Sequence, residues 1–163
     1  MKNIFAKTIL RAYASLESMA GQIDDLVYRQ ALSTHSLKGD CICMSAQRQV
    51  EKVVKLMNKK NNLINLKLLT DEVLASLDGD SKILLVDKYV KKEDKEKTIS
   101  RLEISNRTYF RRLILAEEKF AKGCILRGCD EKWFEENYFD QRWLTEIFDN
   151  IKRKAEQNKK EKN

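Results

Sequence analysis

The chain has 163 residues, no proline and only five glycines, so residues that interrupt helices are almost absent. Its formal net charge of +7 favours a polyanionic partner over an acidic one. The apolar runs are too short for a membrane span or a signal peptide, and the chain lacks a glycine-rich phosphate loop, paired histidines and a nucleophile with its base. We therefore expect an all-α, cytoplasmic protein that binds no cofactor and is not an enzyme.

Residues 3–32 carry apolar side chains at alternating spacings of four and three, namely Phe5, Ile9, Ala12, Leu16, Met19, Ile23 and Leu26. This heptad pattern predicts a long helix with a narrow seam that packs against another helix. Tyr13, Ala20 and Val27 widen the seam, which favours a helical hairpin within one chain over an isolated coiled coil.

A second long helix is expected after a loop over residues 33–44, with Ser45 as its N-cap. Its inner side is predicted to contain Val50, Val53, Val54, Met57, Ile64, Leu68 and Leu69. The short loop favours antiparallel helices. A separate short helix is expected from Thr70 or Asp71 to Leu77, after which Asp78, Gly79 and Asp80 form a turn. Residues 1–79 are interpreted as a helical hairpin that serves as a packing or dimerisation arm.

Residues 80–122 have the pattern of a helix-turn-helix. Apolar residues between 83 and 90 share one face of a supporting helix, which the charged segment 91–97 closes. A short second helix around Thr98 and Ile99 is followed by a turn at Glu103 and Ile104, and Ser105 is a good N-cap. One apolar stripe then predicts a third helix, through Tyr109, Leu113, Ala116 and Phe120.

The first two turns of this third helix are rich in side chains that bind DNA. Arginine contacts guanine or phosphate, asparagine contacts adenine, and hydroxyl groups contact phosphate oxygens. An ordinary solvated helix face is the alternative for such a charge pattern. The candidate DNA-binding residues are Lys97, Ser105, Asn106, Arg107, Thr108, Tyr109, Arg111 and Arg112.

The segment from Leu102 to Ala116, LEISNRTYFRRLILA, resembles the fourth region of bacterial sigma factors. It is more similar to the late-gene transcription regulators of phages and prophages, the ArpU-like and RinA-like proteins, whose S-x-x-T-Y-x-R signature stands here as Ser105, Thr108, Tyr109 and Arg111. Glu103 departs from the glycine that sigma factors usually carry in the turn. The resemblance implies a sigma-region-4-like helix-turn-helix and a role in transcription.

The C-terminal part divides into an aromatic segment and a basic tail. Gly123 and Gly128 are expected to mark a loop, and residues 123–151 then form a C-terminal aromatic helical segment. Its aromatic side chains either complete the core by folding back on the hairpin or form an interface. Residues 152–163 are basic and poor in apolar side chains, so we expect a disordered tail.

The four cysteines, Cys41, Cys43, Cys124 and Cys129, have spacings that fit zinc motifs poorly. Free thiols are the favoured interpretation, with no metal site, and His35 is expected to lie in a solvent-exposed loop.

These patterns predict a sequence-specific transcription regulator that binds double-stranded DNA and has no membrane partner. RNA polymerase and a second copy of the chain, forming a homodimer, are further candidate partners. The alternative is a helical assembly or adaptor protein, similar to a small terminase subunit or a sigma-like polymerase-binding module, which uses the same helices for protein contacts.

Overall fold

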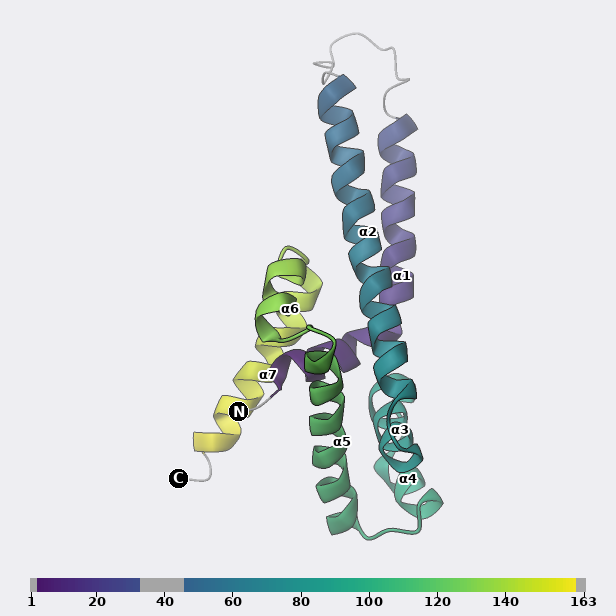
Figure 1. Cartoon of the computed structure of the whole chain (residues 1–163), viewed down its shortest axis with the longest axis vertical. Helices are drawn as coiled ribbons and strands as arrows, with labels where there is room; N and C mark the ends of the chain where they lie inside the picture. Colours follow the sequence, from purple (N-terminus) through teal and green to yellow (C-terminus); the bar gives the residue numbers. More distant parts are fainter. Residues whose placement is uncertain (1–2, 33–45, 161–163) are drawn as a thin grey trace. The chain divides into compact units, whose positions relative to one another are not determined.

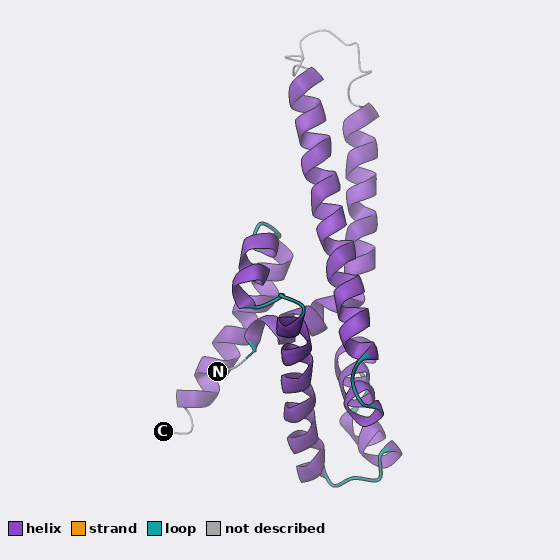
Figure 2. Ribbon diagram, viewed as in Figure 1, coloured by secondary structure: helices purple, strands orange, loops and turns teal. Residues whose placement is uncertain are grey.

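The structure, a computed structural model, describes residues 3–32 and 46–160. Every regular element within these ranges is a helix, and no strand occurs in them (Figure 2). The prediction of an all-α protein is confirmed. The predicted loop at 33–44 and the predicted cap at Ser45 lie outside the described residues, as do His35, Cys41 and Cys43.

The chain divides into two compact units. The main unit contains Met1–Ala14 and Leu68–Asn163, and the hairpin unit contains Ser15–Lys67. The long helices α1 (Ile4–Leu32) and α2 (Ala46–Ala75) each contribute to both units. This division differs from the predicted boundary at residue 79, because the start of α1 and the end of α2 group with the helices that follow.

In the hairpin unit, α1 and α2 lie side by side and antiparallel (Figure 1). Two ion pairs join them: Asp24 with Lys60 at 2.7 Å, and Glu17 with Lys67 at 3.0 Å. The later of these α1 residues, Asp24, meets the earlier α2 residue, and Glu17 meets the later one, as an antiparallel pair requires. The predicted antiparallel hairpin is therefore confirmed for these residues.

The predicted inner side of α2 is wrong for most of its members. Within the hairpin unit, the exposed fractions of Val50, Val54, Met57 and Ile64 are 62%, 47%, 52% and 39%. The covered face contains Val53, as predicted, together with Leu56, Leu63 and Leu66. Helix α2 carries two apolar faces, each with spacings near three and four, so periodicity alone did not determine which one meets α1.

Helix α2 continues without a break to Ala75, so the predicted separate helix from Thr70 is also wrong. No proline or glycine interrupts this stretch, and Thr70 is fully buried within the continuous helix. The next helix, α3 (Gly79–Leu85), begins after Asp78, whose carboxylate accepts a hydrogen bond from the Ser81 backbone N–H at 3.0 Å.

The core of the main unit combines residues from distant parts of the sequence. From α1 it includes Phe5, Ile9 and Leu10, and from α5 (Asn106–Leu126) it includes Leu113 and Phe120. The first turns of the predicted α1 seam therefore belong to this core and not to the hairpin unit.

The C-terminal aromatic segment forms two helices, α6 (Glu131–Tyr138) and α7 (Arg142–Lys160). Phe134 is fully buried and stacks with Tyr138 and Phe148 at ring-centre distances of 5.4 and 6.3 Å. The segment is thus part of the core. Helix α7 continues well past Ile151, in contrast to the predicted disordered tail, because its lysines, glutamate and glutamine are good helix formers.

Gly123 does not mark a loop as predicted but lies inside α5. A Cβ atom at this position would lie 2.7 Å from Cγ1 of Val73, at the end of α2. The glycine therefore allows the two helices to approach closely. Helix α5 ends at Leu126, and Gly128 follows its C-cap with a φ of +76°, a left-handed conformation that favours glycine.

Candidate nucleic-acid interface

The candidate site is built from α4 (Lys95–Arg101), the turn after it and the first turns of α5. Helix α4 starts earlier than predicted and includes part of the charged segment 91–97. It ends with a hydrogen bond from the Ile104 N–H to the Ile99 carbonyl at 3.2 Å, across Glu103 with φ of +51°. This is a Schellman-type helix end, in which the left-handed position normally favours glycine. Glu103, the departure from the sigma-factor pattern, occupies that position.

A buried carboxylate holds α4 against the preceding π-helical segment η2 (Val86–Lys91). Asp87 of η2 accepts hydrogen bonds from the Thr98 hydroxyl at 3.2 Å and from the Arg101 guanidinium at 3.0 and 3.2 Å. Its side chain is 2% exposed, so its desolvation is offset by these charged and polar partners. Arg101 is also bonded to Glu93, at 2.5 Å. The position of α4 is therefore fixed at both Thr98 and Arg101.

Ser105 is the N-cap of α5, as predicted. Its hydroxyl oxygen accepts from the Thr108 backbone N–H at 3.2 Å and is 2.9 Å from the Thr108 hydroxyl. Both hydroxyl groups are thus engaged in starting the helix. Their proximity to the helix end also places them beside the free N–H groups of the first turn.

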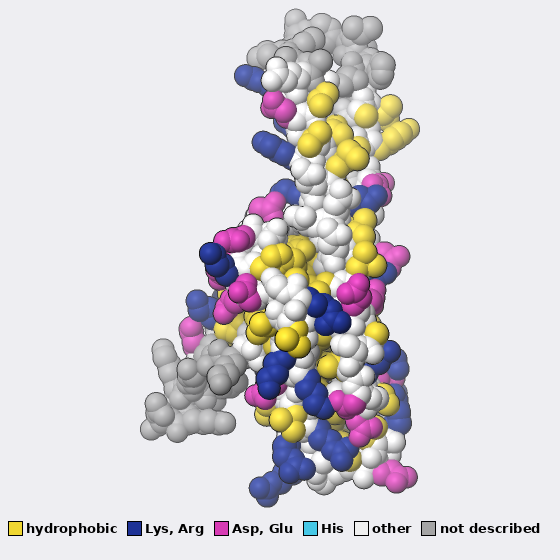
Figure 3. Space-filling model, in the orientation of Figure 1, with side chains coloured by type: hydrophobic (Ala, Val, Ile, Leu, Met, Phe, Trp, Pro, Cys, Tyr) yellow, Lys and Arg dark blue, Asp and Glu magenta, His cyan; other side chains and the backbone are white. Residues whose placement is uncertain are grey.

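Besides Ser105, four of the predicted DNA-binding residues are exposed: Lys97 on α4, and Asn106, Arg107 and Arg111 on α5. Arg107 and Arg111 are four residues apart and therefore lie on the same side of the helix. Figure 3 shows Lys and Arg side chains gathered over the part of the main unit that contains α3, α4 and the start of α5. These residues form the candidate interface.

Two other predicted residues have structural roles instead. Tyr109 is 5% exposed and belongs to the core, as its place in the apolar stripe requires. Burial raises the pKa of its hydroxyl above the ordinary value, with the carboxylate of Asp87 adding to the effect. Arg112 donates to Asp80 at 3.0 Å and thereby joins α5 to α3. Both residues are less exposed than Arg107 and Arg111.

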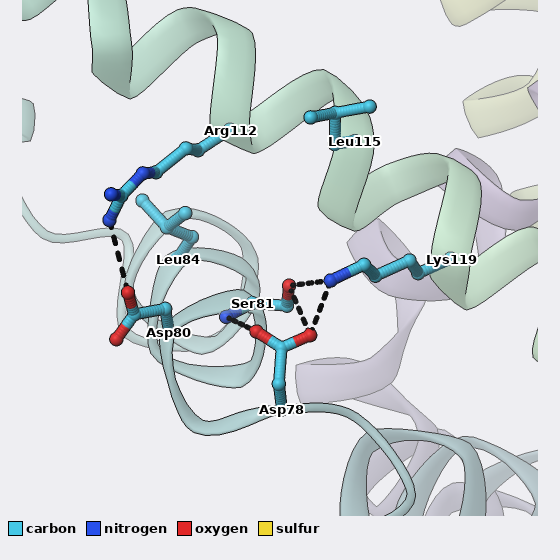
Figure 4. Close-up of a pocket in the computed structure, with 7 residues that line it drawn as sticks. All are labelled: Asp78, Asp80, Ser81, Leu84, Arg112, Leu115 and Lys119. Atoms are coloured by element: carbon cyan, nitrogen blue, oxygen red, sulfur yellow. Dashed lines mark hydrogen bonds and ion pairs between the residues drawn. The ribbon is translucent and has the colours of Figure 1, made fainter.

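The Asp80–Arg112 ion pair lies at one edge of a small hollow between α3 and α5 (Figure 4). Lys119 reaches across the other edge to Asp78 at 2.5 Å, and Leu84 and Leu115 complete the lining. The hydrogen bonds from Lys119 and Ser81 hold the pKa of Asp78 well below its ordinary value. Asp78 and Asp80 are each paired with a cation of α5, so these two ion pairs attach the start of α3 to α5.

A buried glutamate anchors the middle of α5. Glu117 accepts from the Tyr89 hydroxyl at 2.6 Å and from the ammonium groups of Lys88 and Lys7 at 2.9 and 2.7 Å. Burial by itself raises the pKa of Glu117, but these three donors outweigh burial and the pKa lies below its ordinary value. The charged form of Glu117 therefore ties α1, η2 and α5 together.

Phe110 and Lys95 belong to the exposed surface but are not among the predicted site residues. Phe110 is 49% exposed, and the Lys95 ammonium lies 5.9 Å from the centre of its ring. The signal was present in the spacing, because Phe110 follows the buried Tyr109 by one residue and so points about 100° away from the apolar stripe. Ile114 is exposed on the same side, at 55%.

Within the described ranges, no group of three or more His, Cys, Asp or Glu side chains is arranged to hold a metal ion. Cys124 and Cys129 are buried free thiols, and burial raises the pKa of Cys124 to about 12. None of the helices in residues 3–32 and 46–160 has the length and apolar character of a membrane span. Comparison with known proteins found no matching family model, no matching curated protein and no matching solved structure.

Proposed function

We propose that the chain is a sequence-specific DNA-binding transcription regulator of the phage or prophage type, with the first turns of α5 in the major groove. The observation that carries the proposal is the exposure of Asn106, Arg107 and Arg111 on these turns, beside Lys97 of α4. Tyr109 is buried and anchors the opposite side of this helix in the core, so the polar side faces outward.

The exposed side chains match the chemistry of a DNA duplex. Arginine can donate two hydrogen bonds to the O6 and N7 acceptors of guanine, and asparagine can bond to adenine in the same groove. Lys97 and the free N–H groups at the start of α5 suit phosphate oxygens. Contacts of the first kind select a sequence, whereas contacts of the second kind position the helix.

The supporting contacts favour a rigid reading surface. Asp87 fixes α4, Ser105 caps α5, and Glu117 fixes the middle of α5. Side chains on a fixed helix lose less conformational entropy on binding than side chains on a loop, which raises affinity without additional contacts.

An assembly or adaptor protein is the second candidate, and one observation favours it. Phe110 and Ile114 expose apolar surface on the same helix as the two arginines. Aromatic and arginine side chains together are typical of protein interfaces. A sigma-like module that binds RNA polymerase would use such a surface, whereas a DNA reader would use Phe110 only against a thymine methyl group.

Selection of duplexes from a random pool, followed by fluorescence anisotropy with the retained sequence, tests the proposal. Arg107→Ala and Arg111→Ala should each lose about 1 to 3 kcal/mol of binding free energy and relax specificity at one position. Lys122→Ala is the matched control, because Lys122 is an exposed cation about 16 Å beyond Arg111 along the same helix. Its affinity should stay close to that of the parent.

Binding should also weaken steeply as salt rises, because neutralised phosphates release counterions. A chain that retains no duplex sequence, or whose two arginine variants bind as well as the parent, is not a DNA reader of this kind. The exposed face of α5 would then be assigned to a protein partner.

A further inference from the structure

Helix α2 has an exposed apolar face with the spacing of a coiled-coil seam. Its members in the hairpin unit are Val50, Val54, Met57, Asn61 and Ile64, here called the α2 stripe. The spacings of four, three, four and three residues are those of a heptad repeat. At 1.5 Å per residue the α2 stripe is about 21 Å long. Figure 3 shows apolar side chains exposed along this hairpin.

Helix α1 does not cover the α2 stripe. The covered face of α2 contains Leu56 and Leu63, which lie about 120° and 140° around the helix from Val50, at the middle of the stripe's width. A two-helix hairpin gives each helix only one neighbour, so the second apolar face of α2 has no partner within the hairpin unit. An apolar face of this length on a helix normally marks an interface.

The composition of the α2 stripe indicates what covers it. Asn61 is its single polar member and stands at an a position of the heptads, with Val54 at the preceding a position. A lone asparagine at an a position costs stability, but it selects a partner that presents another polar group at the same level. A second copy of α2 meets this requirement when a two-fold axis brings Asn61 opposite Asn61.

The charges around the α2 stripe also suit a second copy. The exposed residues along its open edge are Glu51, Asn58 and Asn65, which carry little net charge. Lys52, Lys55 and Lys59 lie about 140° to 200° around the helix from Val50, which stands at the middle of the stripe's width. On the other edge, Lys60 and Lys67 are paired with Asp24 and Glu17 of α1 at 2.7 and 3.0 Å. In a chain with a net charge of +7, this arrangement keeps like charges out of a symmetric contact.

We propose that the α2 stripe is the surface through which two copies of the chain associate, with the Asn61 side chains facing each other. The α2 stripe would be the seam between two hairpins, giving a four-helix arrangement in which both apolar faces of α2 are covered. The proposal concerns the hairpin unit and holds whether or not α5 binds DNA.

Light scattering and sedimentation equilibrium on the full chain without DNA, at micromolar concentrations, test this interface. The parent should have the mass of two chains. Val54→Glu should weaken the association by more than about tenfold, because the two-fold axis buries the introduced charge twice. Lys55→Gln changes the net charge by the same amount at an exposed neighbouring position and should leave the dimer intact. Circular dichroism should show equal helix content in all three.

Asn61→Val supplies a test that damage to the fold cannot imitate. Removal of the polar group from the seam should tighten association by about tenfold or produce larger assemblies, since the asparagine limits both. A parent that keeps the mass of one chain, a dimer that survives Val54→Glu, or an Asn61→Val variant that associates more weakly would each overturn the proposal. Failure to bind DNA in the separate binding experiment would leave this result unaffected.

Discussion

Apolar stripes of the same spacing are buried on α5 of the main unit and exposed on α2 of the hairpin unit. On α5, Tyr109, Leu113, Ala116 and Phe120 are each at most 5% exposed. In the α2 stripe, the apolar members are 39% to 62% exposed. Helix α5 packs against α3, and its Glu117 is paired with lysines of α1 and η2. Each helix of the hairpin, by contrast, has one neighbour. Spacing thus defines a face, and the number of neighbouring elements decides whether it is covered.

The largest expected difference between the units concerns apolar side chains. Leu113→Ala should destabilise the fold by about 2 to 5 kcal/mol, because Leu113 is 3% exposed and its truncation leaves a cavity. Its neighbour Ile114 is 55% exposed, and Ile114→Ala should change stability by less than about 0.5 kcal/mol. In the hairpin unit Val54→Ala should be similarly mild in dilute solution. Urea denaturation measures all three, and a mild Leu113→Ala would mean that the register of α5 is wrong.

The second difference concerns buried and exposed ion pairs. Glu117→Gln should lower the free energy of unfolding by about 1 to 3 kcal/mol, because it removes the charge that three donors surround. In the hairpin unit, Glu17→Gln removes the charge from the ion pair with Lys67. Glu17 is 81% exposed, so this change should lower the free energy of unfolding by at most about 1 kcal/mol. Thermal unfolding at neutral pH compares the two variants. Equal losses would contradict the proposed role of Glu117 in the core.

The same residue predicts a pH dependence. The pKa of Glu117 is lower in the folded protein than its ordinary value of 4.5, so the unfolded chain takes up the proton first as pH falls. The stabilisation from Glu117 is therefore complete above about pH 4.5 and is lost as pH falls through the folded pKa. The stability difference between the parent and Glu117→Gln should shrink over that acidic range. A difference that stays constant down to the folded pKa would show that the carboxylate charge does not matter.

The last expected difference is one of sign and concerns two helical glycines. Gly123→Ala should destabilise the main unit by about 1 to 2 kcal/mol, because the added methyl group would collide with Val73. Gly21 is exposed on α1, and a Cβ atom there would meet nothing within 4 Å. Gly21→Ala should therefore stabilise the hairpin unit by about 0.5 to 1 kcal/mol through higher helix propensity. The two melting temperatures should move in opposite directions, and a shift of both in the same direction would disprove the close contact at Gly123.

The sequence by itself determined the helical class, the first turns of the candidate site and the local chemistry of the helix ends. The absence of proline and the apolar periodicity predicted helices. The N-cap at Ser105 could be predicted because capping depends on a residue and its neighbours two or three positions away. The exposure of Arg107 and Arg111 follows from their positions relative to Tyr109 on the same helix.

Tertiary structure alone decided which of two apolar faces α2 turns toward α1, and that Gly123 allows close packing where a loop was predicted. It also paired Arg112 with Asp80 and surrounded Glu117 with donors from α1 and η2. These contacts join residues that are between 28 and 110 positions apart in sequence. Local propensity and periodicity carry no information about such pairs, because the partner of a helix face is set by which other elements compete to cover it.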